Sequence, residues 1–105
     1  MKIIKTSFKD LLVIEPDVYN DSRGYFFESY NEKQLQKAGI NIEFVQDNQS
    51  HSVKNVIRGL HFQAPPHVQA KLIRTLKGSI LDIAVDLRKD QPTYKKVFSF
   101  VKNGQ

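Results

Sequence analysis

The sequence predicts an all-β sandwich or barrel, and three observations support this fold class. Several short stretches are rich in β-branched and aromatic residues, turn-forming residues separate them, and one stretch alone has a helical pattern. The chain has 105 residues, which is enough for one domain and too few for two. We therefore expect residues 1–105 to form a single, mostly β domain.

The first third of the chain contains three strand-like stretches. Pro16 interrupts the second of them, and a proline inside such a stretch marks an edge or a strand end. Turn residues Asn20, Asp21 and Ser22, followed by Gly24, separate the second stretch from the third. The expected strands lie in "KIIKTSF" (2–8), "LLVIEPDVY" (11–19) and "YFFESY" (25–30).

One short helix is expected near residues 32–38. Asn31 can cap its first turn, and Gln34 stands three residues later, as in a capping box. Gly39 follows the helical stretch and is a typical helix stop.

From residue 42 onward the pattern predicts strands again. Lys77-Gly78 can form a two-residue hairpin loop between residues 71–76 and 79–88, with Lys71 facing Ala84. Both faces of that hairpin are largely apolar, so we expect it to be buried on both sides. Asp82 would then be a buried acid beside Lys71. We count six or seven strands, whereas a closed small barrel needs about eight, so the domain is expected to be incomplete.

The charge of the chain is unevenly distributed. Residues 1–52 contain 6 Lys and Arg against 8 Asp and Glu, whereas residues 53–105 contain 10 against 3, and the formal net charge is +5. A basic half is compatible with nucleic acid, an anionic metabolite or a solvated surface. Basic and aromatic residues do not interleave as a nucleic-acid strip. We therefore expect no nucleic-acid partner and favour a phosphorylated small molecule.

Several other classes receive no support from the sequence. The chain contains no cysteine, which excludes disulfide and thiolate chemistry in it. It has no apolar run of membrane length, and "MKIIKTSFKDLL" does not read as a signal peptide. We therefore expect a cytoplasmic protein without a membrane partner. Nucleophile-elbow and phosphate-loop motifs are absent, and nothing specific supports a glycosidase pair.

"RGLHFQAPPHVQAK" (58–71) raises the question of what His61 does between two apolar residues. The residue two positions after His61 is Gln63, and no Glu lies in residues 44–105, so we expect no metal site. A structural histidine bonded to a carbonyl group is one reading. The other is a base, because Arg58 and Lys71 nearby would favour the neutral, proton-accepting imidazole.

Four segments carry a family resemblance. They are "SRGYFFESYN", "FVQDNQSHS", "VIRGLHFQAPPHVQAKLIRTLKGSILDIAVDLR" and "PTY", within a match that runs from the first residues to about residue 101. Together they closely resemble dTDP-4-dehydrorhamnose 3,5-epimerases, the enzymes of dTDP-L-rhamnose synthesis. The resemblance implies a cupin-like jelly roll, or double-stranded β-helix, of which this chain would be the N-terminal part. It implies no metal or other cofactor.

The resemblance also implies roles for particular residues. His61 matches the base that removes the protons at C3 and C5 beside the C4 ketone of a dTDP-4-keto-6-deoxy sugar, and Lys71 matches the lysine near the ketone oxygen. Arg58 matches a substrate-binding arginine near the diphosphate and sugar. The remaining substrate-binding matches are Gln46, Asp47 and Asn48, and also Arg23 and Glu28, which in the family reach across a homodimer that exchanges N-terminal residues.

The family extends well past residue 105, and this departure leaves alternatives open. Its second half supplies the tyrosine acid, a further histidine and the acidic partner of the base, and Tyr94 lies in a different motif. A non-catalytic nucleotide-binding module is therefore one alternative. A related sugar-nucleotide ketoisomerase is another, although Phe62-Gln63 stands where such enzymes have a second histidine.

Arg58 and His61 differ by three positions, so regular alternation would place them on opposite faces of a strand. We expect a β-bulge at Gly59 to bring both side chains to one pocket.

Overall fold

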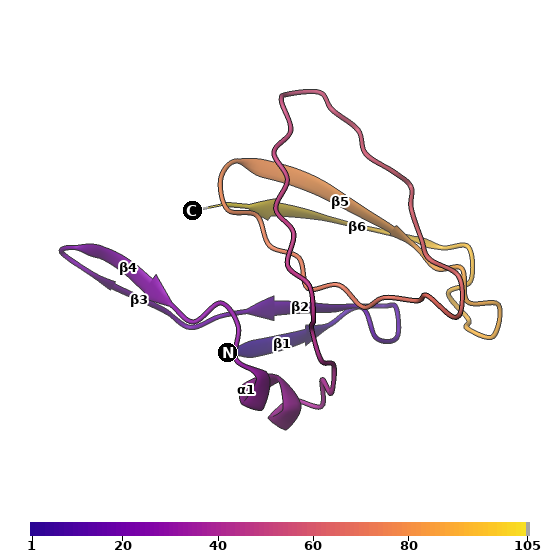
Figure 1. Ribbon diagram of the computed structural model, residues 1–105, viewed down its shortest axis with the longest axis horizontal. Helices are drawn as coiled ribbons and strands as arrows, with labels where there is room; N and C mark the ends of the chain where they lie inside the picture. The colour runs from indigo at the N-terminus through magenta and orange to yellow at the C-terminus, as the bar shows by residue number, and fades with distance from the viewer. Residues whose placement is uncertain (105) are drawn as a thin grey trace. The chain divides into compact units, whose positions relative to one another are not determined.

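The computed structural model describes residues 1–104, which form six strands and one short helix (Figure 1). The strands are paired in three antiparallel two-stranded sheets, β1–β2, β3–β4 and β5–β6. Their bounds are β1 Lys2–Lys5, β2 Leu12–Glu15, β3 Val18–Asp21, β4 Gly24–Phe27, α1 Glu32–Lys37, β5 Ser79–Val85 and β6 Val97–Asn103. The predicted predominance of strands with a single short helix is confirmed.

The described chain divides into two compact units. One comprises Met1–Asn31 together with the residues from Ile73 onward, and so holds all six strands. The other is Glu32–Leu72, which begins with α1 and continues without regular secondary structure.

The turn between β1 and β2 carries the main buried aromatic contact of the first unit. Phe8 is buried, and its ring lies 6.1 Å from the ring of Phe98 in β6, centroid to centroid. Thr6 fixes this turn, because its hydroxyl donates to the Leu11 carbonyl at 2.7 Å and accepts from the Phe8 amide at 3.1 Å. The turn therefore positions an apolar side chain against β6.

The turn predicted before Gly24 is confirmed, but the strand expected over residues 11–19 is two strands, β2 and β3, and β3 includes Asn20 and Asp21. Pro16 separates β2 from β3, and the strands pair from Val18 with Phe27 to Asp21 with Gly24. Ser22 and Arg23 form the loop with negative φ values, while Gly24 has a φ of 130°. This conformation is costly for residues with a Cβ, so the glycine is needed for backbone geometry.

Helix α1 starts at the predicted residue and ends at Lys37, one residue before the predicted end. Its C-terminus is a Schellman motif, in which the Gly39 amide donates to Gln36 at 3.0 Å and the Ile40 amide to Leu35 at 2.8 Å. Gly39 has a φ of 87°, as this motif requires. Leu35 is the buried residue of the helix.

The predicted hairpin around Lys77-Gly78 is wrong. Strand β5 pairs instead with β6, from Ser79 opposite Asn103 to Val85 opposite Val97. The segment 71–76 contains no strand. Pairing of β5 with β6 is physically reasonable because it joins seven antiparallel residue pairs. The predicted two-residue loop would begin with a lysine, which is not favoured at the first position of such a loop.

Asp82 consequently has a different partner from the one expected. Its carboxylate accepts a hydrogen bond from the Lys102 Nζ at 2.6 Å, across the β5–β6 pair, and not from Lys71. Asp82 is half-buried, so the ion pair lies at the border of the packed region.

Asp86 closes the connection between β5 and β6, residues 86–96. Its carboxylate is buried and accepts hydrogen bonds from the Arg88 amide, from the Arg88 guanidinium and from the Thr93 hydroxyl. The backbone of Asp86 also bonds to two consecutive residues of the returning chain, Lys95 and Lys96, which is the pattern of a β-bulge. These contacts bring β6 back beside β5.

The strands predicted from residue 42 to residue 76 are not formed. Between the end of α1 and the start of β5 the described chain is irregular, and most of its large apolar side chains are exposed, reaching 92% for Ile57 and 73% for both Leu60 and Phe62. Strands are stabilised by pairing with a neighbouring edge and by burying one face, and in the described structure residues 42–76 pair with no strand. The expected bulge at Gly59 is likewise wrong in form, because no ladder passes through it, although Gly59 has a φ of 110°.

Candidate active site

The predicted site residues fall into both units. Arg23 and Glu28 lie in the strand-containing unit, Arg23 in the β3–β4 turn and Glu28 directly after β4. The second unit holds the others, all exposed, namely Gln46, Asp47, Asn48, Arg58, His61 and Lys71. Within this unit Gln46 and Asn48 are joined by a side-chain hydrogen bond of 3.3 Å.

Arg58 is held by the chain that precedes it. Its Nε donates to the Ser52 hydroxyl at 2.8 Å, and its Nη2 donates to the His51 carbonyl at 3.0 Å. Both bonds use one edge of the guanidinium, which leaves the other edge available for an acceptor. An arginine fixed in this manner is suited to binding a phosphate group.

His61 and Lys71 lie on irregular, exposed backbone. A Cβ added at Gly59 would lie 3.5 Å from the backbone nitrogen of His61 and 3.5 Å from its Nδ1, so the imidazole is folded back toward Gly59. Within the described residues, neither His61 nor Lys71 forms a side-chain hydrogen bond or an ion pair. Both groups are therefore available to act on a bound molecule.

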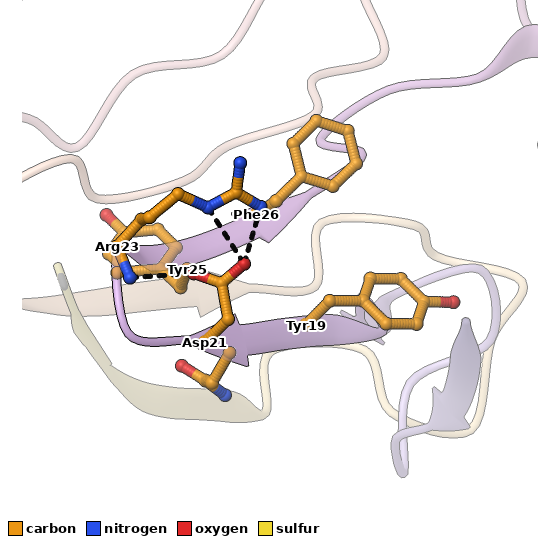
Figure 2. Close-up of a pocket in the computed structure, with 7 residues that line it drawn as sticks. Tyr19, Asp21, Arg23, Tyr25 and Phe26 are labelled. Atoms are coloured by element: carbon orange, nitrogen blue, oxygen red, sulfur yellow. Dashed lines mark hydrogen bonds and ion pairs between the residues drawn. The ribbon is translucent and has the colours of Figure 1, made fainter.

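The β3–β4 hairpin carries a pocket of about 490 Å³ (Figure 2). Its lining residues are Tyr19, Asn20, Asp21, Arg23, Gly24, Tyr25 and Phe26. The pairing of Tyr19 with Phe26 places these two exposed rings on one face of the hairpin, together with Asp21. The pocket thus combines exposed aromatic rings with one cation.

Arg23 folds back over Asp21 in this pocket (Figure 2). Its amide donates to Asp21 Oδ1 at 2.8 Å, while its Nε and Nη2 donate to Oδ2 at 3.1 and 2.6 Å. The hydrogen bonds from Arg23 hold the pKa of the Asp21 carboxyl below its ordinary value, and the same pair raises the pKa of Arg23. Asp21 is therefore a carboxylate at neutral pH.

Sequence reasoning missed the two side chains that hold the arginines. The sequence pattern predicts Asp21 only as a turn residue, and no pattern points to Ser52. The spacing Asp-x-Arg across a hairpin loop was the available signal for the first pair, since an Asp side chain commonly accepts from the amide two residues later. Ser52 lies six residues before Arg58, and no short-range rule connects them.

The part of the chain that the structure describes contains neither a metal-binding cluster nor a membrane-spanning helix. No group of three or more acidic or histidine side chains in residues 1–104 is arranged to hold a metal ion. No helix in the same part of the chain is long and apolar enough to cross a bilayer.

Residues 5–103 match the family model described as dTDP-4-dehydrorhamnose 3,5-epimerase. The chain belongs to this family. Arg23, Arg58, His61 and Lys71 all lie inside the matched region.

Curated relatives share the name of the family. The epimerase of Shigella flexneri is 50% identical over 97 residues, which are 91% of this chain and 54% of the relative. That of Methanothermobacter thermautotrophicus is 53% identical over 93 residues, 89% of this chain and 50% of the relative. The chain thus spans about half the length of the curated relatives it matches.

Solved epimerase structures show the same fold. The Bacillus anthracis enzyme, with TDP and PPi bound, is 48% identical and has a TM-score of 0.93 over 97% of this chain and 59% of its own. The Legionella pneumophila enzyme, in complex with dTDP-4-keto-L-rhamnose, is 42% identical with a TM-score of 0.91, over 98% of this chain and 55% of its own. The cupin-like jelly-roll prediction is confirmed.

Proposed function

We propose that this protein acts as a dTDP-4-dehydrorhamnose 3,5-epimerase, which inverts C3 and C5 of dTDP-4-keto-6-deoxyglucose. The observation that carries the proposal is the family match over residues 5–103, which includes the whole "RGLHFQ" block. The substrate class is supported by the dTDP-sugar and TDP bound to relatives that are 42% and 48% identical.

His61 is the proposed base. A proton α to a ketone is weakly acidic, so its removal needs a base that is neutral near pH 7 and a cation at the developing enolate oxygen. In the proposed step the C3 or C5 proton moves to the imidazole, the C–H electron pair forms the enolate, and the Lys71 ammonium stabilises its oxygen. The reaction needs a proton delivered to the opposite face of the carbon to complete the inversion. No residue of this chain is assigned to that delivery.

Binding is assigned to two arginines and a polar segment. Arg58 is the proposed ligand of the diphosphate, with Gln46, Asp47 and Asn48 contacting the nucleotide sugar. Arg23 and Glu28 are proposed to contact the nucleotide of a second subunit in a homodimer. The net charge of +5 favours association with a dianionic diphosphate.

We further propose that both units belong to one jelly-roll domain that acts in the cytoplasm. Its exposed apolar residues, among them Ile57 and Phe62, would be covered by the part of the family fold that this chain does not span. The length of the relatives supports this view, since the match accounts for 50–54% of them in the pairs compared above.

A binding module without turnover is the second candidate. It is favoured by the same fact of length, because the acid of the family reaction matches no residue here. A ketoisomerase is less well supported, since Gln63 stands two residues after His61. Both alternatives predict retention of the substrate configuration at C5.

The test is conversion of dTDP-4-keto-6-deoxyglucose, followed by proton NMR of the sugar ring. The proposal predicts signals of dTDP-4-keto-L-rhamnose that are lost in His61→Ala, while His67→Ala serves as the matched control from the same loop. Tight binding of dTDP with no new sugar signals would instead establish the binding module.

A further inference from the structure

We infer that Asp21 is a positioning residue for Arg23, which it orients so that the guanidinium presents its outer edge to a diphosphate. The inference rests on the proposed function for the identity of the ligand. It concerns a residue that received no functional role from the sequence.

The two oxygens of the Asp21 carboxylate contact different parts of Arg23. Oδ1 accepts from the Arg23 amide at 2.8 Å and so fixes the backbone of the turn. Oδ2 accepts from Nε and Nη2 at 3.1 and 2.6 Å and so fixes the guanidinium. One side chain therefore fixes both ends of the arginine.

These bonds leave a defined set of donors. A guanidinium has five N–H groups, and Asp21 takes Nε–H and one from Nη2. Two on Nη1 and one on Nη2 remain, and in Figure 2 the third nitrogen of the guanidinium points away from the carboxylate. The edge formed by Nη1 and Nη2 matches two oxygens of a phosphate group.

The exposure of Arg23 explains why a positioning residue matters. The side chain is 88% exposed, so packing does not restrict it. A free arginine loses rotamer freedom when it binds, and this loss weakens affinity. Asp21 restricts the side chain in advance, while the high exposure of Arg23 leaves its outer edge accessible to a ligand.

The direction in which Asp21→Asn changes anion affinity distinguishes a positioning role of Asp21 from a purely electrostatic one. Asp21→Asn can keep the backbone bond through its amide oxygen, but it turns an N–H₂ group toward the guanidinium. If Asp21 acted only as a charge, its removal would tighten anion binding. Positioning predicts the opposite, a weakening of about 3- to 10-fold.

The experiment uses the whole chain, with calorimetric titration of dTDP and, separately, of inorganic pyrophosphate. NMR of the arginine Nε–H groups gives a second readout, with the Arg23 signal assigned from Arg23→Lys. Asp90→Asn is the matched control, because it removes the same charge from an exposed position in the β5–β6 connection.

We expect the Arg23 Nε–H to be rigid in the wild type and mobile in Asp21→Asn. Anion binding should be weakened in Asp21→Asn and unchanged in Asp90→Asn. In Arg23→Lys the further change Asp21→Asn should have no weakening effect. Equal or tighter binding by Asp21→Asn, or binding of neither anion by the wild type, would overturn the inference. Binding of pyrophosphate but not of dTDP would count against the proposed function, and the effect of Asp21 on pyrophosphate would still decide the inference.

Discussion

Arg58 donates from its Nε to the hydroxyl of Ser52 at 2.8 Å, and this bond fixes one edge of an exposed arginine. The arrangement parallels that of Arg23, whose Nε also bonds to an oxygen of a nearby side chain. Both arginines of the proposed binding set are therefore oriented before any ligand arrives.

Ser52→Ala should weaken the binding of dTDP about two- to fivefold, because Arg58 keeps only its bond to the His51 carbonyl and gains rotamer freedom. Calorimetric titration of dTDP into the chain measures the effect. Ser50→Ala is the control, since it makes the same change two residues earlier. Equal affinities of the two variants would show that Ser52 does not orient Arg58.

Asp86→Asn should lower stability at neutral pH and remove one source of its pH dependence. The Arg88 guanidinium, followed by the Thr93 hydroxyl, holds the pKa of the Asp86 carboxyl far below its ordinary value. A carboxyl group of this kind stabilises the fold fully above its unfolded pKa of about 3.9, and the contribution is lost as the pH falls toward the folded value.

Urea denaturation of wild type and Asp86→Asn between pH 7 and pH 2 measures this contribution. The gap between the two midpoints should be constant from pH 7 to about pH 5 and should shrink below about pH 4. A gap that stays the same down to pH 2 would show that the Asp86 contacts do not favour the ionised form.

Lys95→Gly should be more stable than Lys95→Ala. The φ of 66° at Lys95 lies in the left-handed region, at the bulge opposite Asp86. Lys95→Gly and Lys95→Ala both lose the contact of the ammonium with the Tyr94 ring, so their difference isolates the backbone. We expect the glycine variant to be more stable by about 1 kcal/mol.

The neighbouring residue supplies the control for this prediction. Lys96 does not have a positive φ, so Lys96→Gly should be less stable than Lys96→Ala by about 0.5–1 kcal/mol. Thermal denaturation of the four variants measures both differences. The same sign at both positions would contradict the assignment of a left-handed bulge to Lys95.

Local patterns predicted the elements whose stabilising contacts are local. The turn before Gly24 and the capping residues around 32–38 located the start of β4 and the helix α1, whereas β2 and β3 were expected as one strand over residues 11–19. The partner of β5 could not be predicted in this manner, because β6 returns through a connection that the buried Asp86 closes, and two candidate strands had similar composition. Asp82 was assigned the wrong partner for the same reason.

The candidate site also contains residues that the sequence predicted and residues that it did not. The family resemblance predicts roles for His61, Lys71 and the two arginines, which remain predictions, and residues 5–103 match the family model. The orienting contacts of Asp21 and Ser52 depend on how a turn and a loop fold, and periodicity carries no information about them. Apolar residues near His61, such as Leu60 and Phe62, are typical of a strand, but in the described structure they are exposed and lie in irregular backbone.

His61 is the residue proposed to remove the protons beside the ketone. Incubation of the chain with dTDP-4-keto-6-deoxyglucose in heavy water, followed by NMR at C3 and C5, measures this proton removal. We predict deuterium at both carbons, lost in His61→Ala and kept in His67→Ala. Inversion at the labelled carbons would mark complete epimerisation, whereas label with retained configuration would mark proton removal alone. Absence of deuterium at both carbons while dTDP is bound would show that His61 does not remove these protons.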